Sequence, residues 1–225
     1  MTKKRYKKKK KRLFIPIFII FIVLCVAVVY VLYRFNYIPH IKFSNAYFNI
    51  ETYVSEVDKD HDGIDDQSDI LKNVRNYIST KPKYKSAYYE SGYPNDEYGV
   101  CSDVVAFGLL DAGYDLQKLV DEDIKEHPER YDVDKRDNKI DFRRVKNLRV
   151  FFKHNAISLT TDIYDIDQWQ GGDIVVFKKH IGIVSDKRNF NGVTFAIHHG
   201  NPYQRFYEED ILEYRNDIVG HYRMS

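Results

Sequence analysis

The chemistry-bearing residues of this chain begin with one thiol, Cys101, which stands where a helix is expected to start. It lies in the segment GVCSDVVAFGLLDAGYDL, in which Gly99 allows a tight turn and Gly113 ends an apolar run. Backbone N–H groups and the dipole at a helix start stabilise a thiolate. An unperturbed thiol with a pKa of ~8.5 is only about 3% ionised at pH 7. The helix dipole alone does not close that gap, so Cys101 needs a base to act as a nucleophile.

The two cysteines cannot serve each other as disulfide partners. Cys25 lies inside a long apolar run, whereas Cys101 lies far outside it. A disulfide needs Cα atoms within about 7 Å, and an apolar run that spans a membrane would hold Cys25 in the bilayer while Cys101 lies in the domain outside it. The alternative interpretation of Cys101 is a small apolar side chain packed inertly in the core.

Two histidines are candidates for the base and for the group that orients it. The segment GGDIVVFKKHIGIVSD predicts two short buried strands, 173–177 and 181–184, with His180 beside the turn between them. The next expected strand, VTFAIHH, follows the turn Asn191-Gly192 and ends with His198 and His199. Alternation along a strand places these two side chains on opposite faces. We assign His180 as base and His198 as orienter, and the choice between His198 and His199 stays open.

An apolar segment near the N-terminus predicts a membrane anchor. Residues 13–33 contain no charge and would span roughly 31 Å as a helix, which matches a hydrocarbon core. Residues 3–12 hold nine basic residues, so the positive-inside rule keeps the N-terminus in the cytoplasm and places the rest of the chain outside. A cleaved signal peptide is the alternative, but its apolar stretch would be shorter and followed by small residues.

The overall charge argues against a nucleic-acid partner. Without the nine basic residues of 3–12, 26 of the 35 basic residues remain against 33 acidic ones, a net charge of −7 for residues 13–225. A nucleic-acid protein would carry a basic face on its fold. The basic tip beside the apolar segment instead fits orientation and contact with anionic lipids.

The acidic segment 58–69, DKDHDGIDDQSD, has the spacing of a calcium-binding loop. Counted from Asp58, carboxylates stand at places one, three, five, nine and twelve, with a glycine at six. The run resembles thrombospondin type-3 and dockerin-type loops, and the alternative is a solvated acidic linker. The expected calcium is structural, with these ligands: Asp58, Asp60, Asp62, the Ile64 carbonyl, Asp66 and Asp69.

These groups must be positioned by an α+β domain. The sequence predicts helices near 68–79, 101–112, 115–126 and 141–154, followed by a run of short strands. We therefore predict four parts: a cytoplasmic tail, a transmembrane helix, a stalk with the calcium loop, and one catalytic domain. Their bounds are 1–12, 13–33, 34–69 and 70–225.

The run from about Ile70 to Arg223 resembles the domain-of-unknown-function family 1287, a branch of the NlpC-type papain-like cysteine peptidases. The matching pieces occur in collinear order over about two thirds of the chain. They are YP at 93–94, GVCSDVV around Cys101, GYDLQKLVDEDI at 113–124, IDFRRVKNLRVFF at 140–152, GGDIVVF at 171–177, HIGIVSD at 180–186, the His198 strand, and GHYR at 220–223.

The resemblance implies a papain-like fold, with helices packed on a short antiparallel sheet, and a Cys-His-His site at Cys101, His180 and His198. Where this chain has Asp141-Phe142-Arg143-Arg144, the family often has Asp-His-Arg-Arg, so that position is not expected to be catalytic. Arg143 and Arg144 are candidates to bind a substrate carboxylate, and surface or helix charges are the alternative interpretation.

The function that we predict is a membrane-anchored extracellular cysteine hydrolase, a peptidase or amidase that needs no catalytic cofactor. The resemblance implies a bacterial cell-wall peptide or a related envelope amide as substrate. Two alternatives remain: a non-catalytic envelope-binding module on the same fold, and an acyltransferase using the same Cys-His pair.

Overall fold

A computed structural model of the chain describes the backbone of residues 2–224 and the side chains of residues 15–224. The chain divides into two compact units, the first ending at His40 and the second beginning at Ile41. Each is described by itself. The side chains of the basic run 3–12 lie outside the described residues.

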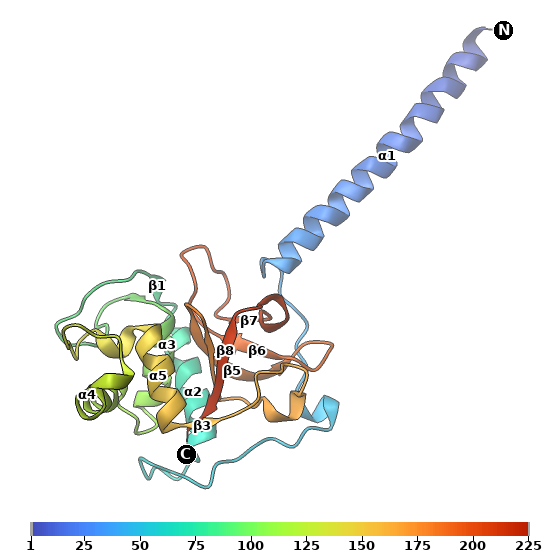
Figure 1. Ribbon diagram of the computed structural model, residues 1–225. Coiled ribbons are helices and arrows are strands. Elements are labelled where there is room, and N and C mark those ends of the chain that lie inside the picture. The colour runs from blue at the N-terminus through green and yellow to red at the C-terminus, as the bar shows by residue number, and fades with distance from the viewer. Residues whose placement is uncertain (1, 225) are drawn as a thin grey trace. The chain divides into compact units, whose positions relative to one another are not determined.

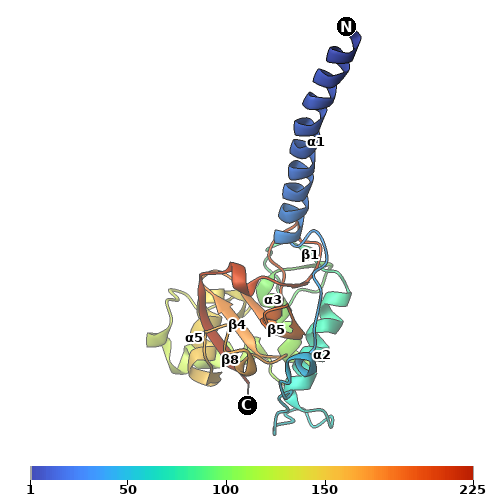
Figure 2. The same ribbon diagram turned by 90° about the vertical axis from the view of Figure 1, so that its right-hand side faces the viewer.

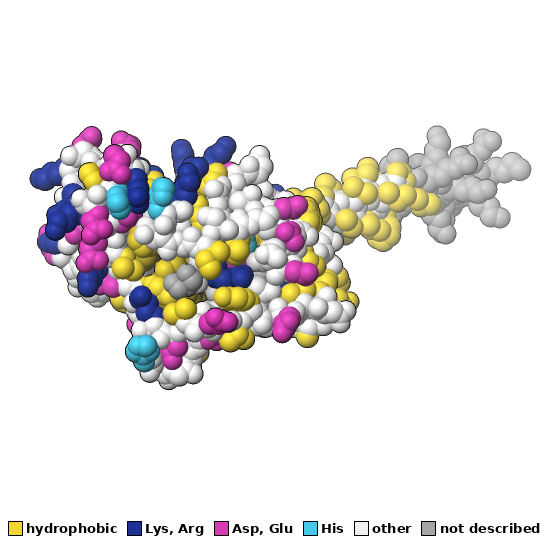
Figure 3. All heavy atoms as spheres, turned by 60° about the horizontal axis from the view of Figure 1, so that its bottom comes forward, with side chains coloured by type: hydrophobic (Ala, Val, Ile, Leu, Met, Phe, Trp, Pro, Cys, Tyr) yellow, Lys and Arg dark blue, Asp and Glu magenta, His cyan; other side chains and the backbone are white. Residues whose placement is uncertain are grey.

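The first unit is dominated by the helix α1, Thr2–Arg34. Its stretch Ile15–Arg34 is long and apolar enough to cross a membrane. Apolar side chains cover the visible face of the described part of this helix (yellow in Figure 3), and none of that stretch is buried by protein. Such a helix near an N-terminus is found both in membrane anchors and in signal sequences.

The second unit is an α+β domain in which helices precede most of the sheet (Figure 1). Four helices were predicted from apolar periodicity and capping residues, and all four form with small shifts of their ends. They are α2, Asp66–Ser79; α3, Cys101–Leu110; α4, Leu116–Glu126; and α5, Val145–Asn155. The segment before α5 makes a separate 3-10 helix, Asp141–Arg143, so α5 begins later than predicted.

The main sheet has six strands in the spatial order β3-β8-β4-β5-β6-β7, and every neighbouring pair is antiparallel. A separate parallel pair, β1 and β2, leads into α3. The strands are β1, Lys83–Tyr84; β2, Tyr98–Gly99; β3, Ile157–Ser158; β4, Ile174–Phe177; β5, Ile181–Arg188; β6, Thr194–Ile197; β7, Glu208–Glu209; and β8, Ile218–Arg223.

Both faces of the sheet are covered. Alternate residues of β4 face opposite sides, so Ile174 and Val176 join the helical core while Val175 and Phe177 join a second cluster around Trp169. The helices α3 and α5 lie against the strands on one side (Figures 1 and 2), where α3 packs on β5 and α5 on β8. This explains why α3 is apolar around nearly its whole surface: it is held between α2 and the sheet.

Residues 41–69, which we predicted as a stalk, belong to the folded second unit. Phe43 pairs with Arg188 at the end of β5, and the buried Asn45 donates to Gln170 Oε1 over 3.0 Å. The sequence did not indicate this packing because residues 41–65, before α2, have no helical or strand periodicity. They pack instead through backbone and amide hydrogen bonds to distant residues.

Candidate active site

Cys101 is the first residue of α3, as the sequence predicted. The parallel pair β1–β2 ends at Gly99 and delivers the chain to the helix start. A Cβ atom at residue 99 would approach the Tyr77 hydroxyl within 2.2 Å, so this close approach requires glycine. The helix α3 packs against β5. The thiol lies at the beginning of that strand, where it contacts the N–H group of Ile181.

The thiol environment differs from the one that we expected. Burial raises the pKa of Cys101 to about 11, although hydrogen bonds from the backbone N–H groups of Ile181 and Ser102 act in the opposite direction. The thiolate stabilisation expected at a helix start is therefore outweighed by desolvation. The resting group is a neutral thiol, and nucleophilic attack requires that its proton be removed.

His180 immediately precedes β5, next to Ile181, whose N–H group contacts the thiol. Its Nε2 lies 3.0 Å from Nδ1 of His198, with the two rings nearly perpendicular. Burial, together with the neighbouring His198 and Arg215, lowers the pKa of His180 to about 2, so the ring is neutral. If its Nε2–H donates to His198, Nδ1 keeps a free lone pair that can accept a proton.

The contact between His180 and His198 extends to a carboxylate that sequence reasoning missed. Nε2 of His198 lies 3.2 Å from Oε2 of Glu209, a buried residue of the short strand β7. Ala196, two residues before His198, pairs with Glu209 across β6 and β7. Nothing in the local sequence EED marks this residue, because only the strand pairing brings it to the histidine.

His199, the open alternative to His198, faces different surroundings. Its ring lies edge-on to Tyr84 and Tyr207, at centroid distances of 5.2 and 5.1 Å. Its Nδ1 is buried without a hydrogen-bond partner among the described residues. The geometry thus places His198, and not His199, against His180.

Arg143 does not have the substrate-binding environment that we predicted for it. Its side chain is 2% exposed, and its Nε and Nη2 donate to the two oxygens of Asp103 over 2.6 and 2.9 Å. Nη1 donates to the Ala87 carbonyl over 2.6 Å. All three nitrogens are thus engaged, and Asp103 in turn accepts from Val100 N–H over 2.8 Å. Arg143 therefore braces the start of the Cys101 helix and is not available to a substrate carboxylate.

Arg144 points to solvent more than Arg143 does, with 44% of its side chain exposed, and it lies 3.5 Å from Asp141. Its predicted role in substrate binding stays a prediction. The adjacent arginines thus have opposite environments because the 3-10 helix turns one of them inward.

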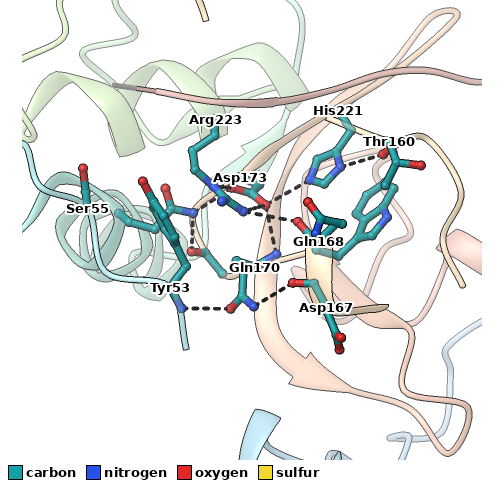
Figure 4. A network of polar contacts seen from close by, with 12 residues as sticks. Tyr53, Ser55, Thr160, Asp167, Gln168, Gln170, Asp173, His221 and Arg223 are labelled. Carbon is teal, nitrogen blue, oxygen red and sulfur yellow. Dashed lines mark hydrogen bonds and ion pairs between the residues drawn. The ribbon is translucent and has the colours of Figure 1, made fainter. Parts of the chain in front are cut away.

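A second buried polar network lies at Asp173, at the start of β4 (Figure 4). Arg223 donates to both carboxylate oxygens, and His221 Nε2 lies 2.9 Å from Oδ2. Burial alone would raise the pKa of Asp173, but the hydrogen bonds from His221 and Arg223 outweigh it and lower the pKa. His221 also stacks on Trp169, so it belongs to this structural network and not to the Cys101 cluster.

Three of the predicted calcium ligands come together. Carboxylate oxygens of Asp58, Asp60 and Asp62 lie within 4.8 Å of one another. Gly63 has the positive φ of 90° that this turn needs. The other two carboxylates have protein partners. Asp66 accepts from Lys59 N–H and the Tyr114 hydroxyl, and Asp69 accepts from Lys72 and Asn73. In the arrangement described, Asp66 and Asp69 therefore do not join the cluster, and for the Ile64 carbonyl metal ligation remains a prediction.

The second unit is thus an α+β domain in which a cysteine begins a helix and the N–H group of Ile181 contacts its thiol. The residue before Ile181, His180, contacts His198. The chain belongs to the family described as "Domain of unknown function (DUF1287)", whose sequence model matches residues 71–224. This confirms the resemblance to that family inferred from the ordered motifs, whereas its place among the NlpC-type papain-like peptidases stays a prediction.

A relative in Escherichia coli (strain K12), named "Uncharacterized protein YijF", is 37% identical over 167 residues. That similarity covers 68% of this chain and 80% of the relative. No solved structure matches the chain significantly.

Proposed function

We propose that the chain is a cysteine hydrolase, a peptidase or amidase on a papain-like (NlpC-type) fold, that acts on bacterial cell-wall peptides or a related envelope amide. The observation that carries the proposal is the 3.0 Å contact between His180 and His198, because the residue after His180, Ile181, donates its N–H group to the thiol of Cys101. The half-buried His180 and the buried His198 are both neutral, and desolvating such a pair has a cost that a chemical role would explain. General-base catalysis on an adjacent thiol supplies one.

The proposed reaction starts from the neutral pair. Nδ1 of His180 takes the thiol proton as Cys101 Sγ attacks the amide carbonyl carbon, and backbone N–H groups at the start of α3 hold the oxyanion. Protonated His180 then gives this proton to the departing amine nitrogen, and the C–N bond breaks to leave a thioester. The same histidine then takes a proton from water as the water oxygen attacks the thioester carbonyl carbon. The C–S bond breaks to release the free acid, and His180 returns the proton to the sulfur of Cys101. His198 orients His180, and Glu209 faces the other nitrogen of His198.

We also propose that α1 is an uncleaved anchor, with the N-terminus in the cytoplasm and the second unit outside the cell. The support is the length of the apolar stretch, Ile15–Arg34, and the basic run that precedes it. An external position matches a cell-wall substrate.

The test of the hydrolase is the release of new amino groups from purified cell-wall peptides by the full chain in detergent micelles. Cys25→Ser, used to remove the other thiol, should keep full activity. In that background we expect no release from Cys101→Ala and at least a ~10²-fold lower rate from His180→Ala. Ser102→Ala and His199→Ala are the matched neighbouring controls and should retain most of the activity.

The outcomes separate the three candidate functions. Undiminished release by Cys101→Ala would refute the mechanism. No release by the unmodified chain, with binding to wall material that Cys101→Ala retains, would favour the envelope-binding module. Appearance of a new amide between the substrate acyl group and an added amine, at the expense of free acid, would favour acyl transfer.

We propose in addition a structural calcium site at Asp58, Asp60 and Asp62, supported by the convergence of their oxygens. Lys72 competes for this charge, since its Nζ lies 3.0 Å from Asp69 and 4.0 Å from Asp62. Calcium should therefore bind weakly, with Kd of about 10⁻⁴–10⁻³ M, as in external modules. Calorimetric titration of the full chain with CaCl₂ checks this. Asp60→Asn should weaken binding, whereas Asp137→Asn, outside the cluster, should not. Heat that is the same for both variants would contradict the site.

A further inference from the structure

A set of uncharged, mostly aromatic side chains, three exposed and two half-buried, is formed by the beginning of the second unit and the residue Phe190 after β5. We call it the aromatic patch, and it consists of Ile41, Phe43, Tyr47, Phe48 and Phe190. Tyr47, Phe190 and Ile41 are 64%, 63% and 58% exposed. The rings form one cluster: Phe43 lies 4.5 Å from Tyr47 and 4.8 Å from Phe190, and Tyr47 lies 5.0 Å from Phe48.

The aromatic patch is rigidly held by the domain beneath it. Phe43 exchanges two backbone hydrogen bonds with Arg188, of 2.8 and 2.9 Å. Arg188 is fully buried, and its guanidinium donates to the carbonyl groups of Ile166, Trp169 and Gly192. Exposed rings on a fixed frame are costly in water, so a cluster of this kind marks an interaction surface.

The chain that connects the first unit to the aromatic patch is short. Within the first unit, the His40 ring stacks on Tyr33 at a centroid distance of 3.7 Å, and its Nε2 lies 2.8 Å from the Tyr33 carbonyl. Only residues 41 and 42 then separate His40 from Phe43. Three residue steps reach at most about 11 Å. If α1 spans a membrane, the aromatic patch cannot move far from the lipid headgroups.

We propose that the aromatic patch rests on the surface of the bilayer that α1 spans, with its rings in the headgroup region. The proposal rests on the anchor proposed above. Phe and Tyr side chains are suited to this region because they combine apolar rings with few groups that need water. The five members carry no charge, so neither desolvation of an ion nor repulsion from anionic lipids opposes the contact.

Docking of the aromatic patch on the bilayer would fix the distance between the proposed catalytic site and the lipid surface. The strand β5 begins beside His180 and ends at Arg188, the partner of Phe43. Its seven steps span about 23 Å. The Cys101 cluster and the aromatic patch thus lie at opposite ends of one strand. Docking raises the site by up to that length above the lipid surface, which favours substrates in the wall over amides of membrane lipids.

The test uses tryptophan fluorescence of the full chain in vesicles whose phosphatidylcholine carries bromine on the acyl chains near the headgroup. Trp169, the one native tryptophan, is buried and gives a constant background. Phe190→Trp and Tyr47→Trp place probes in the aromatic patch. Tyr203→Trp, at a 78% exposed position in the loop after β6, is the matched control.

Probes seated 5–10 Å into the interface should lose about half of their added emission to the brominated lipid, and the control should lose almost none. Equal emission with brominated and ordinary lipid at both patch positions would overturn the proposal. A blue-shifted but unquenched probe would also overturn it and indicate a second copy of the chain as occupant. If the chain does not float with the vesicles, both the proposed anchor and the proposed docking are contradicted. No activity is measured, so either result leaves the hydrolase test independent.

Discussion

Arg143→Ala is expected to destabilise the second unit by about 3–5 kcal/mol, because it leaves a buried carboxylate without its partner. Asp103 is completely buried and receives two nitrogens of Arg143. Without the guanidinium, the charged carboxylate of Asp103 stays buried in protein, which solvates it poorly. The measurement is the free energy of unfolding of the full chain by urea in detergent micelles.

The adjacent residue supplies a matched control. Arg144→Ala removes the same side chain from a position with 44% exposure and a single 3.5 Å contact to Asp141. Asp141 itself is buried, but it keeps the N–H group of Asp137 as a donor over 2.7 Å, so the loss should be clearly smaller than for Arg143→Ala. Equal losses from the two variants would contradict the inward bracing role of Arg143.

A double variant separates the ion pair from the packing of its parts. Asp103→Asn combined with Arg143→Met removes both charges together. It should cost less than the sum of the two single changes, because neither partner is left as an unpaired buried charge. Losses that simply add would mean that the two residues act independently, despite bonds of 2.6 and 2.9 Å.

The same contacts explain why the sequence misled about Arg143. The pattern over 141–154 predicted one amphipathic helix, on which both arginines would lie near its start. A 3-10 turn, Asp141–Arg143, precedes α5 and changes the direction of that segment. Which of two neighbouring arginines turns inward depends on Asp103, forty residues earlier, and no local pattern carries that information.

Local signals did predict the elements that position the candidate site. Gly99, the polar first turn of α3 and the closing glycine mark the Cys101 helix, and β-branched runs around Lys178 and Lys179 mark the hairpin at His180. These features depend on residues close together in sequence. The direction of the thiol pKa shift does not, since it reflects how deeply distant elements bury Cys101.

Glu209 and residues 41–54 are features that the sequence did not predict. Glu209 meets His198 only because β7 pairs with β6 in one register. Residues 41–54 join the domain through contacts such as Asn45 with Gln170, more than a hundred residues apart. In both cases polar residues that look like solvated surface in the sequence are buried by tertiary contacts, and only the folded chain shows it.

Acid is expected to destabilise the second unit well before its carboxylates titrate, because the buried His198 and His199 and the half-buried His180 are neutral in the folded chain. Burial lowers the pKa of His180 to about 2, of His198 to about 3 and of His199 to about 4. In the unfolded chain each returns to about 6.5. Below pH 6.5 the three histidines therefore bind protons in the unfolded state, whereas in the folded state they stay neutral.

Because of this difference in proton binding, the free energy of unfolding falls as the pH drops through the range near 6.5. Stability is fully present above the unfolded pKa and falls as the pH drops below it, at up to 1.36 kcal/mol per pH unit for each histidine. Between pH 7.5 and 5.5 each should cost about 1.4 kcal/mol, or about 4 kcal/mol together. Carboxylates with lowered pKa, such as Asp173 and Glu208, lose their contribution only near and below pH 4.5. They lie outside this window.

The check is the free energy of urea unfolding of the full chain at half-unit steps from pH 7.5 to 5.5. His198→Gln and His199→Gln should each reduce the slope by about one third, even if each also lowers stability at pH 7.5. A packing defect lowers the free energy of unfolding equally at every pH, so it does not change the slope of that free energy against pH. A slope that stays near zero in the unmodified chain would mean that these histidines are accessible to protons in the folded state. The neutral Cys101–His180 pair would then give way to a charged one as the starting point of the reaction.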